Sequence, residues 1–154
     1  MEKKRKLSLT LAQALHDTEI TTRDMEPTQV LSAYDKLEAA FLPKVASDPK
    51  LVVEMQRRIA ENKFLCLSSR NLPFAFILTL FQGVREIGYT NLEKKINMEI
   101  IFARYCLRQN EKDKSKIVLE KLLKEIDQAL KIRNLVYLRE TKKKVQTLLG
   151  EISQ

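Results

Sequence analysis

The sequence predicts an all-α protein built as stacked antiparallel helical hairpins, and three observations support this fold class. Among 154 residues, 44% are apolar and 31% are charged, which suits a folded chain with a heavily charged exterior. Only three glycines and four prolines occur, too few for a turn-rich β-sandwich. Apolar residues recur three and four positions apart through most of the chain, which is the spacing of amphipathic helices. An irregular bundle of the same helices accounts for the same observations.

Residues 1–26 are predicted to be a basic N-terminal tail followed by a short helix or linker. Leucines alternate in this region as they do in a strand, whereas Leu7, Leu11 and Leu15 share one face of a helix. A short helix around these leucines is favoured. The polar residues 17–26 are expected to form a linker.

Residues 27–154 are predicted to form a single α-helical domain. Its first helix is expected to start near Pro27, because proline suits the first helical position, and to end before Pro43. Asp48 then has the character of a capping residue, and Pro49 opens a second helix that extends to about residue 67.

The next segment is apolar nearly all round from residue 72 to residue 81, continues through Val84 and Ile87, and is therefore predicted to be the central helix of the core. The core is expected to centre on Phe74, Ile77, Leu78 and Phe81. Gly83 is expected to mark a close helix crossing, and Gly88 to end the helix.

Residues 90–131 are predicted to form two consecutive helices joined by a short polar turn. Thr90 and Glu93 have the spacing of a capping box, so the first of these helices is expected to begin near Asn91. The second helix is expected to bury one wide stripe, made of Ile117, Leu119, Leu122, Leu123, Ile126, Ala129, Leu130 and Ile132. A final helix from about residue 135 is expected to stop at Gly150.

Two stretches, residues 63–71 and 103–110, share an apolar-Cys-Leu-polar ending, and their cysteines lie 40 residues apart. Each ends a predicted helix that is followed by a second one. The chain therefore resembles a tetratricopeptide-like array of about two and a half hairpins over residues 49–150. The spacing is nearer 40 than that family's 34 residues, and the chain has no tryptophan. The resemblance implies stacked hairpins and a broad role in protein binding.

Little in the sequence points to catalysis. His16 is the only histidine, and three glycines cannot compose a phosphate-binding loop, so neither an enzyme nor a cofactor or metal site is expected. Cys66 and Cys106 lie in apolar segments and are expected to be reduced and buried. The longest apolar run, residues 74–78, is too short to span a bilayer, which favours a cytoplasmic protein.

A stripe on the 91–109 helix is the candidate binding surface. Its members are spaced three and four apart: Lys94, Asn97, Ile101, Arg104 and Arg108. In tetratricopeptide-like arrays the first helix of each hairpin lines the ligand-holding surface, so the resemblance implies that this stripe contacts a partner, together with Arg57 and Phe64 on the preceding hairpin. The expected function is that of a non-catalytic adaptor or scaffold, which binds a protein through an acidic or amphipathic segment. A merely solvated face is the alternative reading of the same stripe.

Nucleic-acid binding, as a basic helical protein or a subunit of a ribonucleoprotein complex, is the second functional class. The net charge is +8, and residues 91–154 carry 15 basic against 9 acidic residues. Such a balance attracts acidic protein surfaces and nucleic-acid backbones alike. The possible nucleic-acid contacts are the basic runs Lys3, Lys4, Arg5 and Lys6, and Lys142, Lys143 and Lys144.

Overall fold

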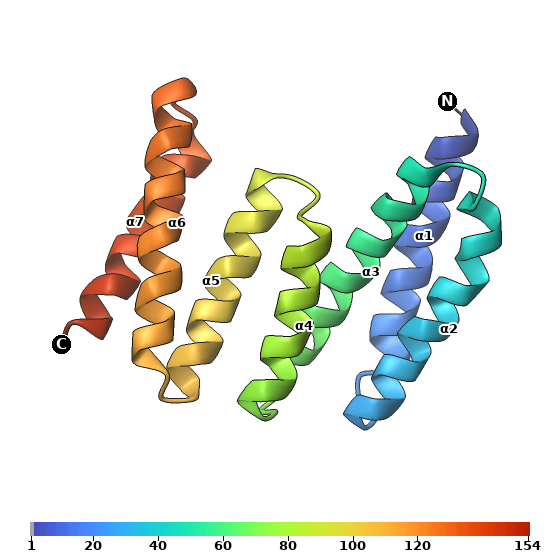
Figure 1. Ribbon diagram of the computed structural model, residues 1–154, viewed down its shortest axis with the longest axis horizontal. Helices are drawn as coiled ribbons and strands as arrows, with labels where there is room; N and C mark the ends of the chain where they lie inside the picture. The colour runs from blue at the N-terminus through green and yellow to red at the C-terminus, as the bar shows by residue number, and fades with distance from the viewer. Residues whose placement is uncertain (1) are drawn as a thin grey trace. The chain divides into compact units, whose positions relative to one another are not determined.

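The computed structural model describes residues 2–154, and in that range it is built from α-helices joined by short connections (Figure 1). The helices are α1 (Glu2–Thr21), α2 (Pro27–Val45), α3 (Pro49–Ser68), α4 (Phe74–Ile87), α5 (Leu92–Arg108), α6 (Lys112–Ile132) and α7 (Val136–Ile152). No strand occurs among the described residues. The all-α prediction is confirmed, and the packing of consecutive helices on each other is consistent with an array of helical hairpins.

The chain divides into two compact units after Thr90. The N-terminal unit ends at Thr90 and contains α1 to α4, whereas the C-terminal unit, Asn91–Gln154, contains α5 to α7. The sequence had suggested one domain over residues 27–154 instead. Residues 2–26 belong with the N-terminal unit because α1 packs against both α2 and α3.

Helix α1 is longer than the sequence predicted. It includes the basic residues near the N-terminus and continues past residue 16, where a linker was expected, to Thr21. Leu11 and Leu15 are buried one turn apart, which ties the helix to its neighbours. The threonine hydroxyls of this end donate to carbonyls one turn back, as Thr18 does to Ala14 at 2.7 Å, so they are satisfied within the helix.

The segment after α1 is held by one guanidinium group. Arg70 donates hydrogen bonds to the backbone carbonyl oxygens of Thr22, Arg23 and Met25, the first two at 2.8 and 2.9 Å. Arg70, two residues beyond the end of α3, thereby fixes the α1–α2 connection.

The predicted starts of α2 and α3 are confirmed, but the predicted end of α2 is wrong. Asp48 accepts a hydrogen bond from the backbone N–H of Lys50 at 3.0 Å and caps α3. Pro43 lies inside α2, in its last turn. A proline there removes only one of the final hydrogen bonds, while Phe41 and Val45 on either side of it remain buried.

In the N-terminal unit α3 is the central helix, because it packs against α1, α2 and α4. The sequence had assigned that place to α4. Ile77 and Phe81 of α4 are fully buried as predicted, whereas Phe74 and Leu78 are only half-buried. A Cβ built on Gly83 would meet nothing within 4 Å, so no close helix crossing occurs at this glycine.

Thr90 does not cap α5, contrary to the capping box read from the sequence. Its hydroxyl donates to one oxygen of the buried Glu61 carboxylate at 2.6 Å, and its backbone N–H donates to the other oxygen at 3.3 Å. Asn91 caps the helix instead by accepting from the N–H of Lys94 at 2.8 Å. A buried carboxylate requires donors, and Thr90 supplies two of them.

In the C-terminal unit α6 packs against both α5 and α7. The core consists of Ile96, Ile100, Ala103, Leu119, Leu122, Ile126, Leu138, Val145 and Leu148. The buried stripe on α6 is narrower than predicted, since Ile117 and Ile132 are 65% and 88% exposed. Gly150 does not stop the final helix, which continues to Ile152; helical glycine costs only about 1 kcal/mol, and nearby Leu148 is buried.

Neither cysteine forms a disulfide. Cys106 is buried as expected, whereas Cys66 is half-buried, so the expectation was too strong for this residue. Burial raises the pKa of the Cys66 thiol, and its sulfur lies 3.1 Å from the hydroxyl of Tyr34. The thiol is therefore kept in its less reactive protonated form.

Candidate functional site

The pattern of burial around α5 leaves one side of this helix exposed. The buried side chains on α5 are Ile96, Met98, Glu99, Ile100, Phe102, Ala103, Tyr105 and Cys106. Asn97, Arg104 and Arg108 are exposed, and Lys94 and Ile101 are partly exposed. The structure thus brings the five predicted residues of α5 together on one stripe, hereafter the α5 stripe.

The α5 stripe carries positive charge without a carboxylate among its members. The neighbouring Lys95 points elsewhere, since its ammonium group pairs with Glu125 of α6 at 2.8 Å. The guanidinium of Arg108 lies 5.7 Å from the ring centre of Tyr105, and burial raises the pKa of that phenol. A cation at this distance from an aromatic face is weakly attracted to it, and Arg108 remains exposed.

A small cleft of about 210 Å³ adjoins the α5 stripe, between the start of α5 and α7. It is lined by Glu93, Ile96, Asn97, Tyr137, Glu140, Thr141 and Lys144. Asn97 belongs to both the stripe and the cleft. The cleft has two acidic residues and one basic residue, so its charge is mixed and the basic character lies on the stripe itself.

Arg57 and Phe64 do not extend the α5 stripe onto the preceding hairpin. Phe64 is completely buried, with its ring centre 4.8 Å from that of Phe81. The Nε–H of Arg57 donates to the carbonyl oxygen of Ile87 at 3.3 Å. Both residues support the fold, because α3 packs on three helices and its corresponding face is covered.

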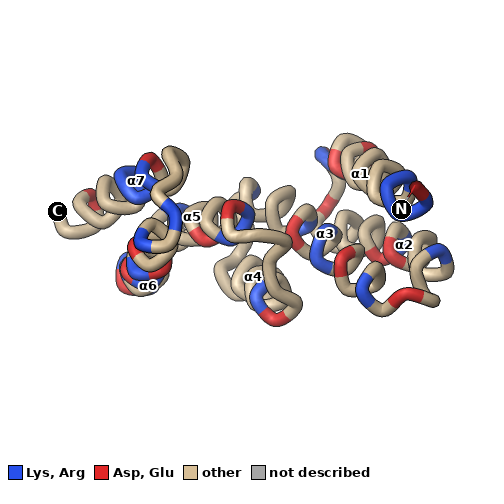
Figure 2. The backbone as a smooth tube through the Cα atoms, turned by 90° about the horizontal axis from the view of Figure 1, so that it is seen from above, with Lys and Arg blue, Asp and Glu red and all other residues tan. Residues whose placement is uncertain are grey.

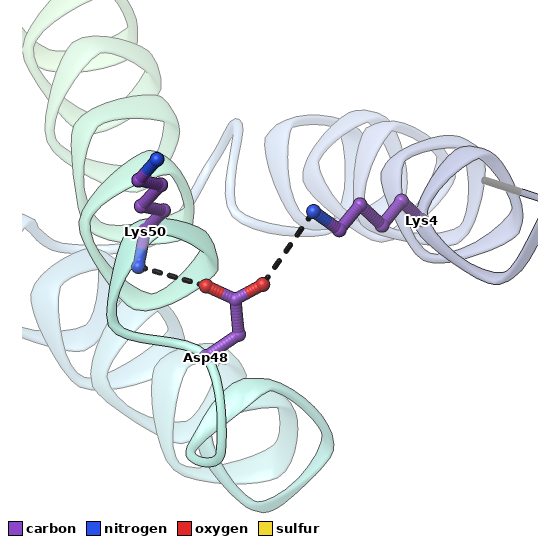
Figure 3. Close-up of polar contacts among 3 residues, drawn as sticks. All are labelled: Lys4, Asp48 and Lys50. Atoms are coloured by element: carbon purple, nitrogen blue, oxygen red, sulfur yellow. Dashed lines mark hydrogen bonds and ion pairs between the residues drawn. The ribbon is translucent and has the colours of Figure 1, made fainter.

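The N-terminal basic residues begin α1 and border a groove. Figure 2 shows Lys and Arg gathered at the start of α1. The groove measures about 400 Å³ and lies between α1, α2 and α3; it is lined by Lys4, Arg5, Leu7, Ser8, Leu11, Phe41, Val45, Lys50, Leu51, Glu54, Met55 and Arg58. Lys4 pairs with Asp48 at 3.6 Å, which places this part of α1 beside the start of α3 (Figure 3). No pattern within one helix predicts the groove, since its walls come from three separate helices.

The second basic run is split around α7. Lys142 and Lys143 face an open groove of about 790 Å³ that is lined by Asp127, Leu130, Lys131, Asn134, Arg139, Lys142, Lys143 and Gln146. Lys144 lines the small cleft on another side of the helix. Lys142 is already paired with Asp127 at 2.7 Å. The three consecutive lysines therefore do not act as one patch.

The described residues form neither a metal site nor a membrane span. Over residues 2–154, no three His, Cys, Asp or Glu side chains gather in a way that could hold a metal ion. In the same range, no helix combines the length and apolarity needed to cross a membrane. His16 is exposed on α1.

No family model, no curated protein and no solved structure matches this chain.

Proposed function

We propose that the protein is a non-catalytic adaptor that binds an acidic or amphipathic segment of another protein through the α5 stripe. The observation that carries this proposal is the exposure of Arg104 and Arg108 on a helix that buries eight of its other side chains. A helix anchored in this way presents its cations on a rigid support. Such a support lowers the entropy that binding would otherwise lose.

The residues of the α5 stripe also indicate which kind of partner segment would fit it. Three basic residues attract a segment that carries Asp or Glu, and complementary charge mainly raises the rate of association. Ile101 lies in the middle of the stripe and is half-buried, so an apolar side chain of the partner can pack on it. An acidic segment with at least one apolar residue therefore fits better than a uniformly charged one.

Reversing two charges of the α5 stripe tests the proposal. The variant R104E/R108E should lose partners that the wild-type chain captures from a lysate of its source organism. The control K121E/K124E makes the same change in net charge at exposed positions of α6. Partners that are lost with the stripe variant and retained with the control, as identified by mass spectrometry, depend on the stripe and not on total charge. Identical captures by both variants would contradict the proposal.

The kinetics of a purified partner give a second measurement. Exposed charge changes alter stability by less than about 0.5 kcal/mol, so the circular dichroism of R104E/R108E should match that of the wild type. Association should slow by about tenfold at low salt, and the difference should shrink as salt screens the charges. An unchanged association rate would show that the stripe is only a solvated face.

A second candidate function, nucleic-acid binding, is favoured by the groove between α6 and α7. Lys131, Arg139 and Lys143 line it in addition to the paired Lys142, and Asp127 is its only acidic residue. Under this alternative, K131E/R139E/K143E should abolish a mobility shift of labelled RNA or DNA, whereas R104E/R108E should weaken it less. Specific binding that survives about 150 mM salt, without any stripe-dependent protein partner, would favour nucleic acid over the adaptor.

A further inference from the structure

The groove of the N-terminal unit differs from the α5 stripe in having an apolar floor. Leu11, Phe41, Val45 and Met55 at its base are buried, and Leu7 and Leu51 are half-buried higher up. A volume of about 400 Å³ lies within the roughly 300–1,000 Å³ range of ligand sites in proteins. The groove is partly open to solvent, so side chains of another molecule can enter it.

The rim of this groove is basic. Lys4, Arg5, Lys50 and Arg58 line it, and Glu54 is its only acidic residue. Asp48 lies close by and accepts from the backbone of Lys50 as well as pairing with Lys4. Figure 3 shows the Lys50 ammonium group on the side away from Asp48. The rim therefore keeps positive charge that Asp48 does not neutralise.

The walls formed by α1 and α3 are held in place by polar contacts. On one side, Arg58 of α3 donates to the carbonyl oxygen of Ser8 at 3.2 Å and to its hydroxyl at 3.0 Å. At the other end Lys4 contacts the start of α3. Because α1 is tied to α3 at two places, the groove is part of the folded unit and does not require a rearrangement to form.

An occupant must match both the floor and the rim. Apolar side chains three and four residues apart on a helix make a ridge that packs between helical walls. Acidic residues on either side of that ridge would meet the basic rim. An amphipathic helix with acidic flanks meets both requirements in the helix-in-groove manner of recognition. A wholly polar acidic segment would leave the floor uncovered.

We propose that the groove between α1, α2 and α3 is a second docking site, which binds an amphipathic helix with acidic flanks. This site lies in the N-terminal unit and the α5 stripe lies in the C-terminal unit, so the protein would have two docking sites. Two docking sites on one chain allow it to bridge partners, which goes beyond the single contact of the proposed function.

The probe for this site is a displayed library of peptides of about 18 residues, or about five helical turns. Each peptide carries a fixed acidic flank on either side of a randomised ridge, and a second library scrambles the order of the same residues. Selection on the full chain should enrich ridges of Leu, Ile, Phe or Met from the first library only. Enriched peptides are then synthesised with a fluorophore, and their affinity is measured by anisotropy.

Two variants of α3 test whether the selected peptide binds in the groove. Leu51→Glu puts a carboxylate in the groove, whereas Val53→Glu makes a similar change at a position that is 39% exposed and does not line it. The first should weaken the selected peptide by about tenfold or more, and the second by less than about twofold. Equal effects of the two substitutions would overturn the proposal.

A charge-reversal pair keeps the test independent of the stability of the Leu51 variant. Arg5→Glu with Lys50→Glu changes two exposed residues of the rim and should weaken binding by about tenfold. Lys3→Glu with Lys36→Glu makes the same change in net charge at exposed positions outside the groove and should have little effect. Equal weakening by both pairs would show that only total charge matters and would overturn the proposal.

Two further arms separate this site from its alternatives. R104E/R108E should leave the affinity for the selected peptide within about twofold, so failure of the α5 stripe and failure of the groove are distinguishable. Dodecanoate, an anionic single-chain amphiphile, tests a lipid occupant. Binding of dodecanoate that Leu51→Glu abolishes, together with no enriched peptide, would overturn the docking of a helix.

Discussion

Phe81→Ala should lower the free energy of unfolding of the N-terminal unit by about 3–5 kcal/mol. Phe81 is completely buried, its ring centre is 4.8 Å from that of Phe64, and the guanidinium of Arg85 lies 4.5 Å from the same ring. Removing the ring loses the favourable free energy of its transfer from water into the core, and it leaves a cavity between α3 and α4. Because the surrounding side chains relax only partly into the cavity, most of the lost stability is not recovered.

Chemical denaturation and hydrogen exchange measure this change. Gln82→Ala, the control at the exposed neighbouring position, should alter stability by less than about 0.5 kcal/mol. In exchange followed by mass spectrometry, Phe81→Ala should speed the exchange of peptides from α3 and α4. A loss of unfolding free energy below about 1 kcal/mol would show that Phe81 is not a core residue.

Ile126→Ala should destabilise the C-terminal unit by about 2–5 kcal/mol. Ile126 is fully buried in the core that α6 forms with α5 and α7. Truncating it leaves a cavity in the core that α6 shares with α5 and α7. Hydrogen exchange should therefore accelerate in peptides from all three helices.

The same helix offers a matched control, because Ile132 ends α6 and is 88% exposed. Ile132→Ala should change stability by less than about 0.5 kcal/mol, although the same atoms are removed. Equal losses for the two isoleucines would contradict the burial pattern of α6.

The positions of most helices follow from local chemistry and are readable in the sequence. Pro27 and Asp48 start helices because proline lacks the N–H that a first turn leaves unpaired and an aspartate can accept a hydrogen bond from one. Gly88 ends α4 because its φ of 93° lies in the left-handed region, which glycine adopts without strain. These preferences act within a few residues and need no tertiary partner.

Where local signals compete, the tertiary structure decides. Thr90 has the local character of a cap, but the buried carboxylate of Glu61, 29 positions away, takes its hydroxyl. Pro43 and Gly150 are local stop signals, yet both lie within helices whose neighbouring side chains are buried. Buried contacts outweigh such propensities, which amount to about 1 kcal/mol for glycine and about 3 kcal/mol for a proline inside a helix.

The sequence by itself determined the α5 stripe, because residues spaced three and four apart on one helix share a side wherever that helix packs. Only the tertiary structure decided that Phe64 is covered and that Arg57 holds the end of α4, since these outcomes depend on how many helices surround α3. The groove of the N-terminal unit was equally hidden. Its walls join residues from Lys4 to Arg58, and no periodicity within a single helix shows which separate helices will meet.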